Sequence, residues 1–177
     1  MIMSAIMGLA SALVNCIPMK VGDINNDGYN AVQLGRDKDA LKALWVQLKM
    51  NGALAEGIGI REMPEEWFES IDGKNDNPMI TSIKVFYCNR LMEMHKFEQT
   101  KEEIKKVLES NMVLVGVYRY LLICDYIYCE LIDGNIIEAE EFYTKDLQKF
   151  MKSMKKFPAI LRTKYTYELL HNKDSKQ

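Results

Sequence analysis

Apolar residues along this chain recur at the spacing expected of helices. Within residues 36–51, four large apolar residues stand at i, i+3, i+4 and i+7 with charged residues between them: Leu41, Leu44, Trp45 and Leu48. This spacing predicts an amphipathic helix with one apolar face. Longer apolar segments follow at 80–94, 113–132 and 158–174. With only four prolines and ten glycines as helix breakers, the pattern predicts an all-α fold.

The first 19 residues carry no charge, and Lys20 is the first charged residue. A helix of this length would span about 28 Å, which is close to the thickness of a bilayer core. Small residues such as Ala5, Gly8 and Ala12 would allow other helices to approach closely. The segment therefore predicts a membrane-type helix, and the alternative is a buried helix of a soluble protein.

Two segments of the C-terminal part repeat 39 residues apart. Residues 95–108 align with residues 134–147, so that Thr100 corresponds to Ala139, and each copy follows a longer apolar segment. A third copy begins at 158–174 without a second helix. The small residue inside the second helix and the turn before it resemble tetratricopeptide-like helical hairpins. That resemblance implies about 2.5 antiparallel hairpins in a right-handed superhelix.

Three regions follow from these patterns. Residues 1–35 hold the membrane-type helix and a loop, residues 36–77 hold linking amphipathic helices and a turn, and residues 78–177 form the helical-repeat domain. The polar stretch 72–78 is the plausible linker between the last two.

Composition restricts the chemistry. With 23 Lys and Arg against 25 Asp and Glu, the net charge is −2, so there is no broad basic surface for nucleic acid. The two histidines, His95 and His171, are too far apart in sequence to suggest a metal or triad motif. None of the four cysteines forms a CxxC pair, which favours small buried thiols in a reducing compartment.

Aromatic and basic residues gather in the second repeat. Its tyrosines and phenylalanines predict a core between helices, with a peptide groove as the alternative. The residues concerned are Tyr118, Tyr120, Tyr126, Tyr128, Phe142 and Tyr143. Five lysines between 145 and 156 could face anionic lipid headgroups, but nearby acidic residues favour a solvated surface of mixed charge.

One loop carries candidate metal ligands. Asp23, Asn25, Asp27 and Gly28 match positions 1, 3, 5 and 6 of an EF-hand calcium loop. Position 12 of that loop should be acidic and is Leu34 here, so the calcium interpretation is poorly supported.

The same loop resembles a motif of another class. An apolar helix that ends in Asn15-x-x-Pro18, followed by a polar loop with Asp27 and Gly28, resembles the second motif of the site-2 protease family of membrane-embedded zinc metalloproteases. The onward residues 36–68 look like a Firmicutes-type branch of that family. This resemblance implies that Asp27 is a candidate third zinc ligand, with Asn15, Pro18 and Gly28 as supporting motif residues.

The HExxH motif that supplies the other two zinc ligands in that family is absent from this chain. We therefore expect a C-terminal part of a site-2-protease-like metalloprotease that is not catalytic by itself. Zinc would belong to the complete family protein, and none is expected for this chain alone. The repeats would bind a protein or peptide partner in the cytoplasm while the chain is associated with the membrane, and no nucleic acid is expected. The alternative is a stand-alone tetratricopeptide-like adaptor with no enzymatic role.

Overall fold

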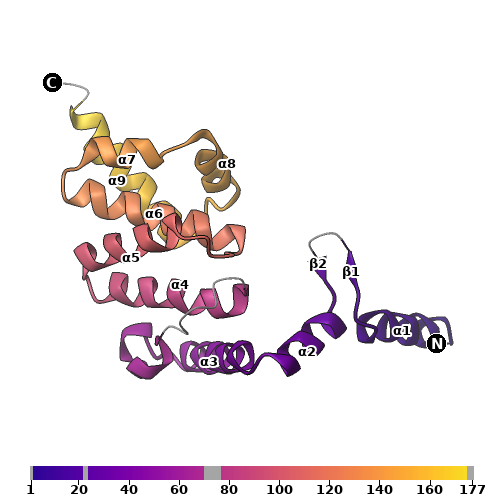
Figure 1. The fold of residues 1–177 in the computed structure, drawn as a ribbon. Coiled ribbons are helices and arrows are strands. Elements are labelled where there is room, and N and C mark those ends of the chain that lie inside the picture. Colours follow the sequence, from indigo (N-terminus) through magenta and orange to yellow (C-terminus); the bar gives the residue numbers. More distant parts are fainter. Residues whose placement is uncertain (1, 22–23, 70–76, 175–177) are drawn as a thin grey trace. The chain divides into compact units, whose positions relative to one another are not determined.

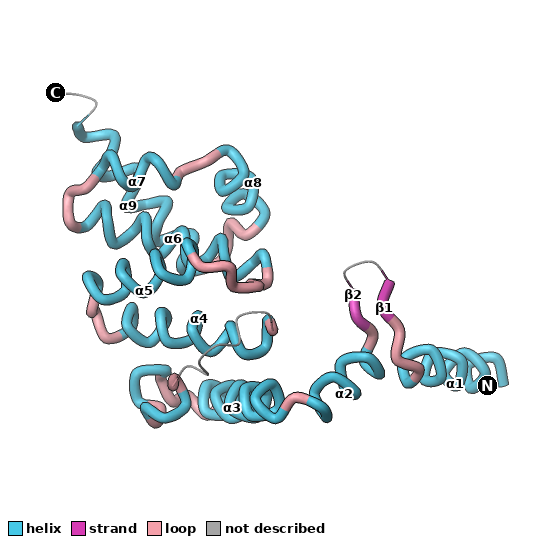
Figure 2. The backbone as a smooth tube through the Cα atoms, viewed as in Figure 1, coloured by secondary structure: helices cyan, strands magenta, loops and turns pink. Residues whose placement is uncertain are grey.

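The computed structural model describes residues 2–21, 24–69 and 77–174. The chain forms two compact units, Met1–Trp45 and Val46–Gln177. Within the described residues the structure is helical except for two short strands, so the predicted all-α class is confirmed (Figures 1 and 2).

The first unit begins with α1 (Ile2–Cys16), a short antiparallel pair of β1 (Lys20–Val21) and β2 (Ile24–Asn25), and α2 (Asp27–Arg36). Helix α3 (Lys38–Ala55) begins in this unit and continues into the second. In its described residues, the second unit then contains two 3₁₀ turns and six helices. Their bounds are η1 (Ile60–Glu62), η2 (Glu65–Trp67), α4 (Pro78–Glu93), α5 (Phe97–Glu109), α6 (Gly116–Ile132), α7 (Ile136–Phe142), α8 (Lys145–Ser153) and α9 (Pro158–Asp174).

Helix α1 is shorter than the uncharged segment that predicts it. It has 15 residues and ends at Cys16, because Pro18 disfavours helical backbone at Ile17. None of the helices in the described part of the chain is long and apolar enough to cross a membrane, which corrects the expected membrane-type helix. The alternative, a buried helix, also differs from the structure, because the side chains of Met3, Ile6 and Leu9 in α1 are more than half exposed.

Helix α3 buries a different face from the one its large apolar residues predict. Leu41, Trp45 and Leu48 are each about half exposed or more, whereas the buried residues are Ala40, Ala43, Val46 and Met50. Gln47, beside this face, donates hydrogen bonds from Nε2 to the Met79 carbonyl (2.9 Å) and to Ser82 Oγ (2.7 Å). These hydrogen bonds connect Gln47 to the start of α4 within the second unit.

The two turns that follow α4 and α6 are equivalent. At the first, His95 N and Lys96 N donate to the carbonyls of Met92 (3.1 Å) and Leu91 (3.0 Å). At the second, 39 residues later, Gly134 N donates to Leu131 O (3.2 Å) and Asn135 N donates to Glu130 O (2.9 Å). This is the Schellman pattern, in which one residue takes positive φ: His95 at 57° and Gly134 at 80°.

In the second unit, helices α4 to α7 pack on their neighbours in chain order, and α9 reaches back to α6. Helix α4 contacts α5, α5 contacts α6, and α6 contacts both α7 and α9 (Figure 1). Thr100 of α5 and Ala139 of α7 are both fully buried at equivalent positions. Small side chains at these positions allow each second helix to approach the helix before it.

The second repeat departs from the first at Tyr143. Residues 134–147 were expected to contain one helix, but α7 ends at Phe142 and α8 starts at Lys145. The Thr144 side chain caps α8 by accepting a hydrogen bond from Leu147 N, at 3.3 Å. The Tyr143 ring stacks on Tyr167 of α9, with centroids 4.0 Å apart and planes at 12°. The cap and the stack together favour the break over a continuous helix.

Two clusters of buried side chains can be described in the core of the second unit, among the residues that the structure describes. One lies between α4, α5 and α6 around Cys88, Ile104 and Leu122, and the other joins α6 to α7, α8 and α9 around Ile127 and Leu147. The predicted core role is confirmed for five of the six aromatic residues, which pack against these clusters: Tyr118, Tyr120, Tyr126, Phe142 and Tyr143. Three free cysteines are buried as expected, while Cys16 is exposed.

Candidate functional site

The loop that carries the candidate zinc ligand is held together by the side chain of Asn26. Its Oδ1 accepts hydrogen bonds from Met19 N and Tyr29 N, each at 2.9 Å. Its Nδ2 donates to the carbonyls of Val14 (2.8 Å) and Ile17 (2.6 Å). Asn26 therefore ties the end of α1 to the start of α2, and sequence reasoning had not assigned it a role.

Of the motif residues, Asp27 and Gly28 lie at the first turn of α2, while Asn15 and Pro18 lie at and just after the end of α1. A Cβ atom on Gly28 would lie 2.4 Å from the Cys16 carbonyl oxygen, so only glycine fits this approach. The structure thus places the four motif residues around one junction, where the Asp27 side chain is exposed.

The ligand set at this junction does not fit a zinc ion by itself. Zinc in proteins takes three or four ligands from Cys, His, Asp or Glu. Among the residues that the structure describes, no group of three or more such side chains gathers at any point. Asp23, the first ligand of the calcium interpretation, lies outside the described residues.

The second unit contains a groove that crosses three helices. It has a volume of about 610 Å³, and its walls come from α4, α6 and α9, with residues from the end of α3, from η1 and from the approach to α9. We call it the Asp125 groove, and the lining residues that matter below are Asn89, Met92, His95, Asp125, Phe157 and Arg162.

Asp125 and Arg162 form an ion pair in the lining of this groove. Arg162 Nη2 donates to Asp125 Oδ1 at 2.5 Å, and Arg162 Cζ lies 4.2 Å from the centroid of the Tyr128 ring. Arg162 Nε is buried and has no hydrogen-bond partner within the described part of the chain. The carboxylate and the aromatic face together hold the guanidinium in one orientation.

Burial dominates the electrostatics of Asp125. Only 6% of the residue is exposed. Desolvation raises the pKa of its carboxyl group to about 6, although the Arg162 guanidinium opposes the shift. Thr163 fixes the pair from the side, since its Oγ1 donates to the Cys124 carbonyl at 2.9 Å. The register of α9 on α6 therefore brings Arg162 to Asp125.

Two other polar side chains that line the groove differ in their hydrogen bonding. Glu93 Oε2 accepts a hydrogen bond from Arg61 N at 2.8 Å and so holds η1. Asn89 is half-buried, and its side-chain amide makes no hydrogen bond within the described residues. An amide group can donate and accept at once, which is the pattern a peptide bond presents.

A cluster of charged side chains joins α5 to α6. The Lys101 ammonium contacts the carboxylates of Glu98 (3.0 Å), Glu130 (3.6 Å) and Asp133. Burial disfavours the charged ammonium, but hydrogen bonds to Asp133 and Glu98 outweigh it and raise the pKa of Lys101. Because the Lys101 ammonium finds its partners within the cluster, we assign the cluster a structural role.

Sequence reasoning did not find the Asp125–Arg162 pair. The available signal was the acidic residue Asp125 inside the apolar segment 113–132, flanked by Cys124 and Tyr126. A carboxylate in such a segment needs a partner when the helix is buried, but nothing in the sequence pattern indicates a partner 37 residues away.

Comparison of the chain with family models, with curated proteins and with solved structures gives no significant match.

Proposed function

We propose that the second unit is a tetratricopeptide-like helical-repeat domain that binds an extended segment of a protein partner in the Asp125 groove. Support comes from the equivalent turns after α4 and α6 and from the small buried residues Thr100 and Ala139. Repeated helix pairs of this kind create continuous surfaces along which a peptide can lie.

The observation that carries the proposal is the ion pair between the buried Asp125 carboxylate and the partly exposed Arg162 side chain in the groove. Moving a carboxylate such as that of Asp125 away from water costs free energy unless it is paired and hydrogen-bonded. A perturbed ionisable group in a cavity is therefore a candidate for ligand recognition. Asp125 fixes the direction of Arg162, while Asn89 has the donor and acceptor that a peptide backbone would use.

The test begins with peptides selected from a random library on the whole chain. We expect Asn89→Ala to weaken the binding of the selected peptides at least about tenfold, as measured by fluorescence polarisation. The reason is that a peptide group at the interface loses its hydrogen-bond partner. Asn111→Ala is the matched control, because Asn111 is exposed and lies outside the groove. Equal loss in both variants, or no loss in either, contradicts the proposal.

A second candidate function rests on the junction of α1 and α2. The exposed carboxylate of Asp27, the close fit of Gly28 against Cys16 and the exposed apolar side chains of α1 favour a role next to a membrane. In this proposal the chain is a membrane-associated part of a site-2-protease-like metalloprotease, and Asp27 would contribute to a zinc site whose other ligands come from outside this chain. The repeat domain would then lie in the cytoplasm.

A further inference from the structure

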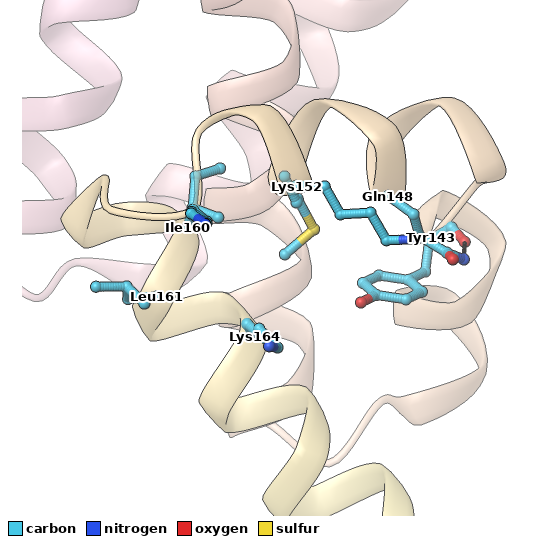
Figure 3. A pocket seen from close by; sticks show the side chains of 8 residues that line it. Tyr143, Gln148, Lys152, Ile160, Leu161 and Lys164 are labelled. Carbon is cyan, nitrogen blue, oxygen red and sulfur yellow. Dashed lines mark hydrogen bonds between the residues drawn. The ribbon is translucent and has the colours of Figure 1, made fainter.

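A second pocket lies between α8 and α9 and shares no lining residue with the Asp125 groove. Its volume is about 430 Å³, within the range of small-molecule sites. We call it the lysine pocket and define it by Lys152, Lys155, Lys164, Tyr143, Met151 and Ile160. Figure 3 shows the side chain of Lys152 running toward Tyr143, with Ile160 and Lys164 contributed by α9.

The charge of this pocket is of one sign. Among the residues that the structure describes, three lysines line it and no carboxylate does. Lys164 has an exposed partner in Glu168, at 3.6 Å. Within the described part of the chain, Lys152 and Lys155 form no ion pair. Neighbouring ammonium groups repel one another, and an anion between them relieves that repulsion.

The inner surface of the pocket is apolar and rigid. Ile160 is fully buried and Met151 nearly so, and both belong to the core cluster that joins α6 to α9. The Tyr143 ring is fixed by its stack on Tyr167, and Gln148 Nε2 donates to the Tyr143 carbonyl at 3.3 Å. A ligand that fits this surface has an anionic end and an apolar body.

We propose that the lysine pocket binds a small organic phosphate, with the phosphate among the three ammonium groups and the apolar body against Met151 and Ile160. A phosphate dianion matches several point charges better than a single carboxylate does, and lysine binds phosphate as a point charge. An anionic bilayer surface would also attract these lysines, but it would not use the apolar floor.

The probes are phenyl phosphate, inorganic phosphate and phenol, titrated into the whole chain and followed by calorimetry. We expect phenyl phosphate to bind at least about tenfold more tightly than either fragment, because it uses both parts of the pocket. In spectra of ¹³C-methyl methionine, the Met151 signal should shift while that of Met50, which is fully buried and does not line the pocket, stays in place.

Variants on α8 distinguish binding in the lysine pocket from general electrostatic attraction of anions to the chain. The double variant Lys152→Gln and Lys155→Gln should weaken the binding of phenyl phosphate at least about tenfold. Lys149→Gln is the matched control, since Lys149 lies on the same helix, pairs with Asp146 at 3.2 Å and does not line the pocket. Unchanged methyl signals of Met50 check that each variant is folded.

Three results would overturn the proposal. One is equal affinity for phenyl phosphate and inorganic phosphate, which would show unspecific attraction of anions. Another is equal loss of binding in Lys149→Gln and in the double variant. The last is binding to vesicles of phosphatidylserine that depends on Lys152 and Lys155 without any binding of phenyl phosphate, which would assign these lysines to a membrane surface.

Discussion

Asp125 is the residue whose environment has the clearest consequence for stability. Aspartate in an unfolded chain titrates near pH 3.9, whereas burial raises the pKa of Asp125 to about 6 in the folded protein. Between these values the folded state binds the extra proton. The stabilisation from this group is therefore fully present below about pH 3.9 and is lost as the pH rises through 6.

We predict that Asp125→Asn flattens this pH dependence. Between pH 3.5 and 7, the free energy of unfolding of the wild type should fall by about 2 kcal/mol more than that of the variant. Urea unfolding at a series of pH values measures this free energy for both proteins. Asp146→Asn, at an exposed pair with Lys149, should keep the wild-type slope. The same slope in Asp125→Asn as in the wild type would show that Asp125 does not titrate in this range.

At the scale of elements, the helices of the second unit depend on the turns that separate them. The turn after α6 requires positive φ at Gly134, as the turn after α4 does at His95. Glycine adopts this backbone without cost, while a residue with a Cβ atom does not. One repeat therefore has the favourable residue at its turn and the other does not.

We predict that Gly134→Ala lowers the free energy of unfolding by about 1 kcal/mol. No atom lies within 4 Å of the position of the new Cβ, so the cost comes from the backbone alone. Gly116→Ala is the control, because Gly116 also has open space around it but no positive φ, and it should be neutral or stabilising. His95→Gly should raise the free energy of unfolding, because it places glycine at a positive φ. Urea unfolding measures all three variants, and a loss of stability in His95→Gly would contradict this account.

At the scale of the whole molecule, the apolar surface of α1 stands out. Large apolar side chains of α1 are exposed in the described structure, among them Ile6, Leu9 and Leu13. A soluble monomer rarely leaves so many apolar side chains in contact with water, and such surfaces mark sites for membranes or partners. This feature supports membrane association for the chain even though no described helix could cross a bilayer.

We predict that the whole chain floats with vesicles of phosphatidylcholine and phosphatidylserine in a density gradient. Ile6→Asp combined with Leu9→Asp should lower the bound fraction at least about tenfold, because each aspartate opposes entry into the acyl region. Leu48→Asp is the control, since Leu48 is an exposed apolar residue outside α1. Flotation that is unchanged by the α1 double variant would show that α1 is not the contact.

Local patterns in the sequence were sufficient for several features of the fold. Periodicity and the scarcity of breakers predict the helical class, and the match at an offset of 39 residues predicts the related turns at His95 and Gly134. The same match predicts a buried small residue at Thr100 and Ala139. These features depend on spacing along one segment, which is what a sequence shows directly.

Tertiary packing decided the rest. Helix α3 buries its alanines instead of its leucines, α7 and α8 separate at Tyr143, and Asp125 meets Arg162 37 residues away. Each outcome is set by which helix lies against which face, and that choice depends on contacts between distant segments. The sequence by itself determined the helical class and the two related turns, whereas the groove and the lysine pocket exist only because α9 packs back onto α6 and fixes the side chains between them.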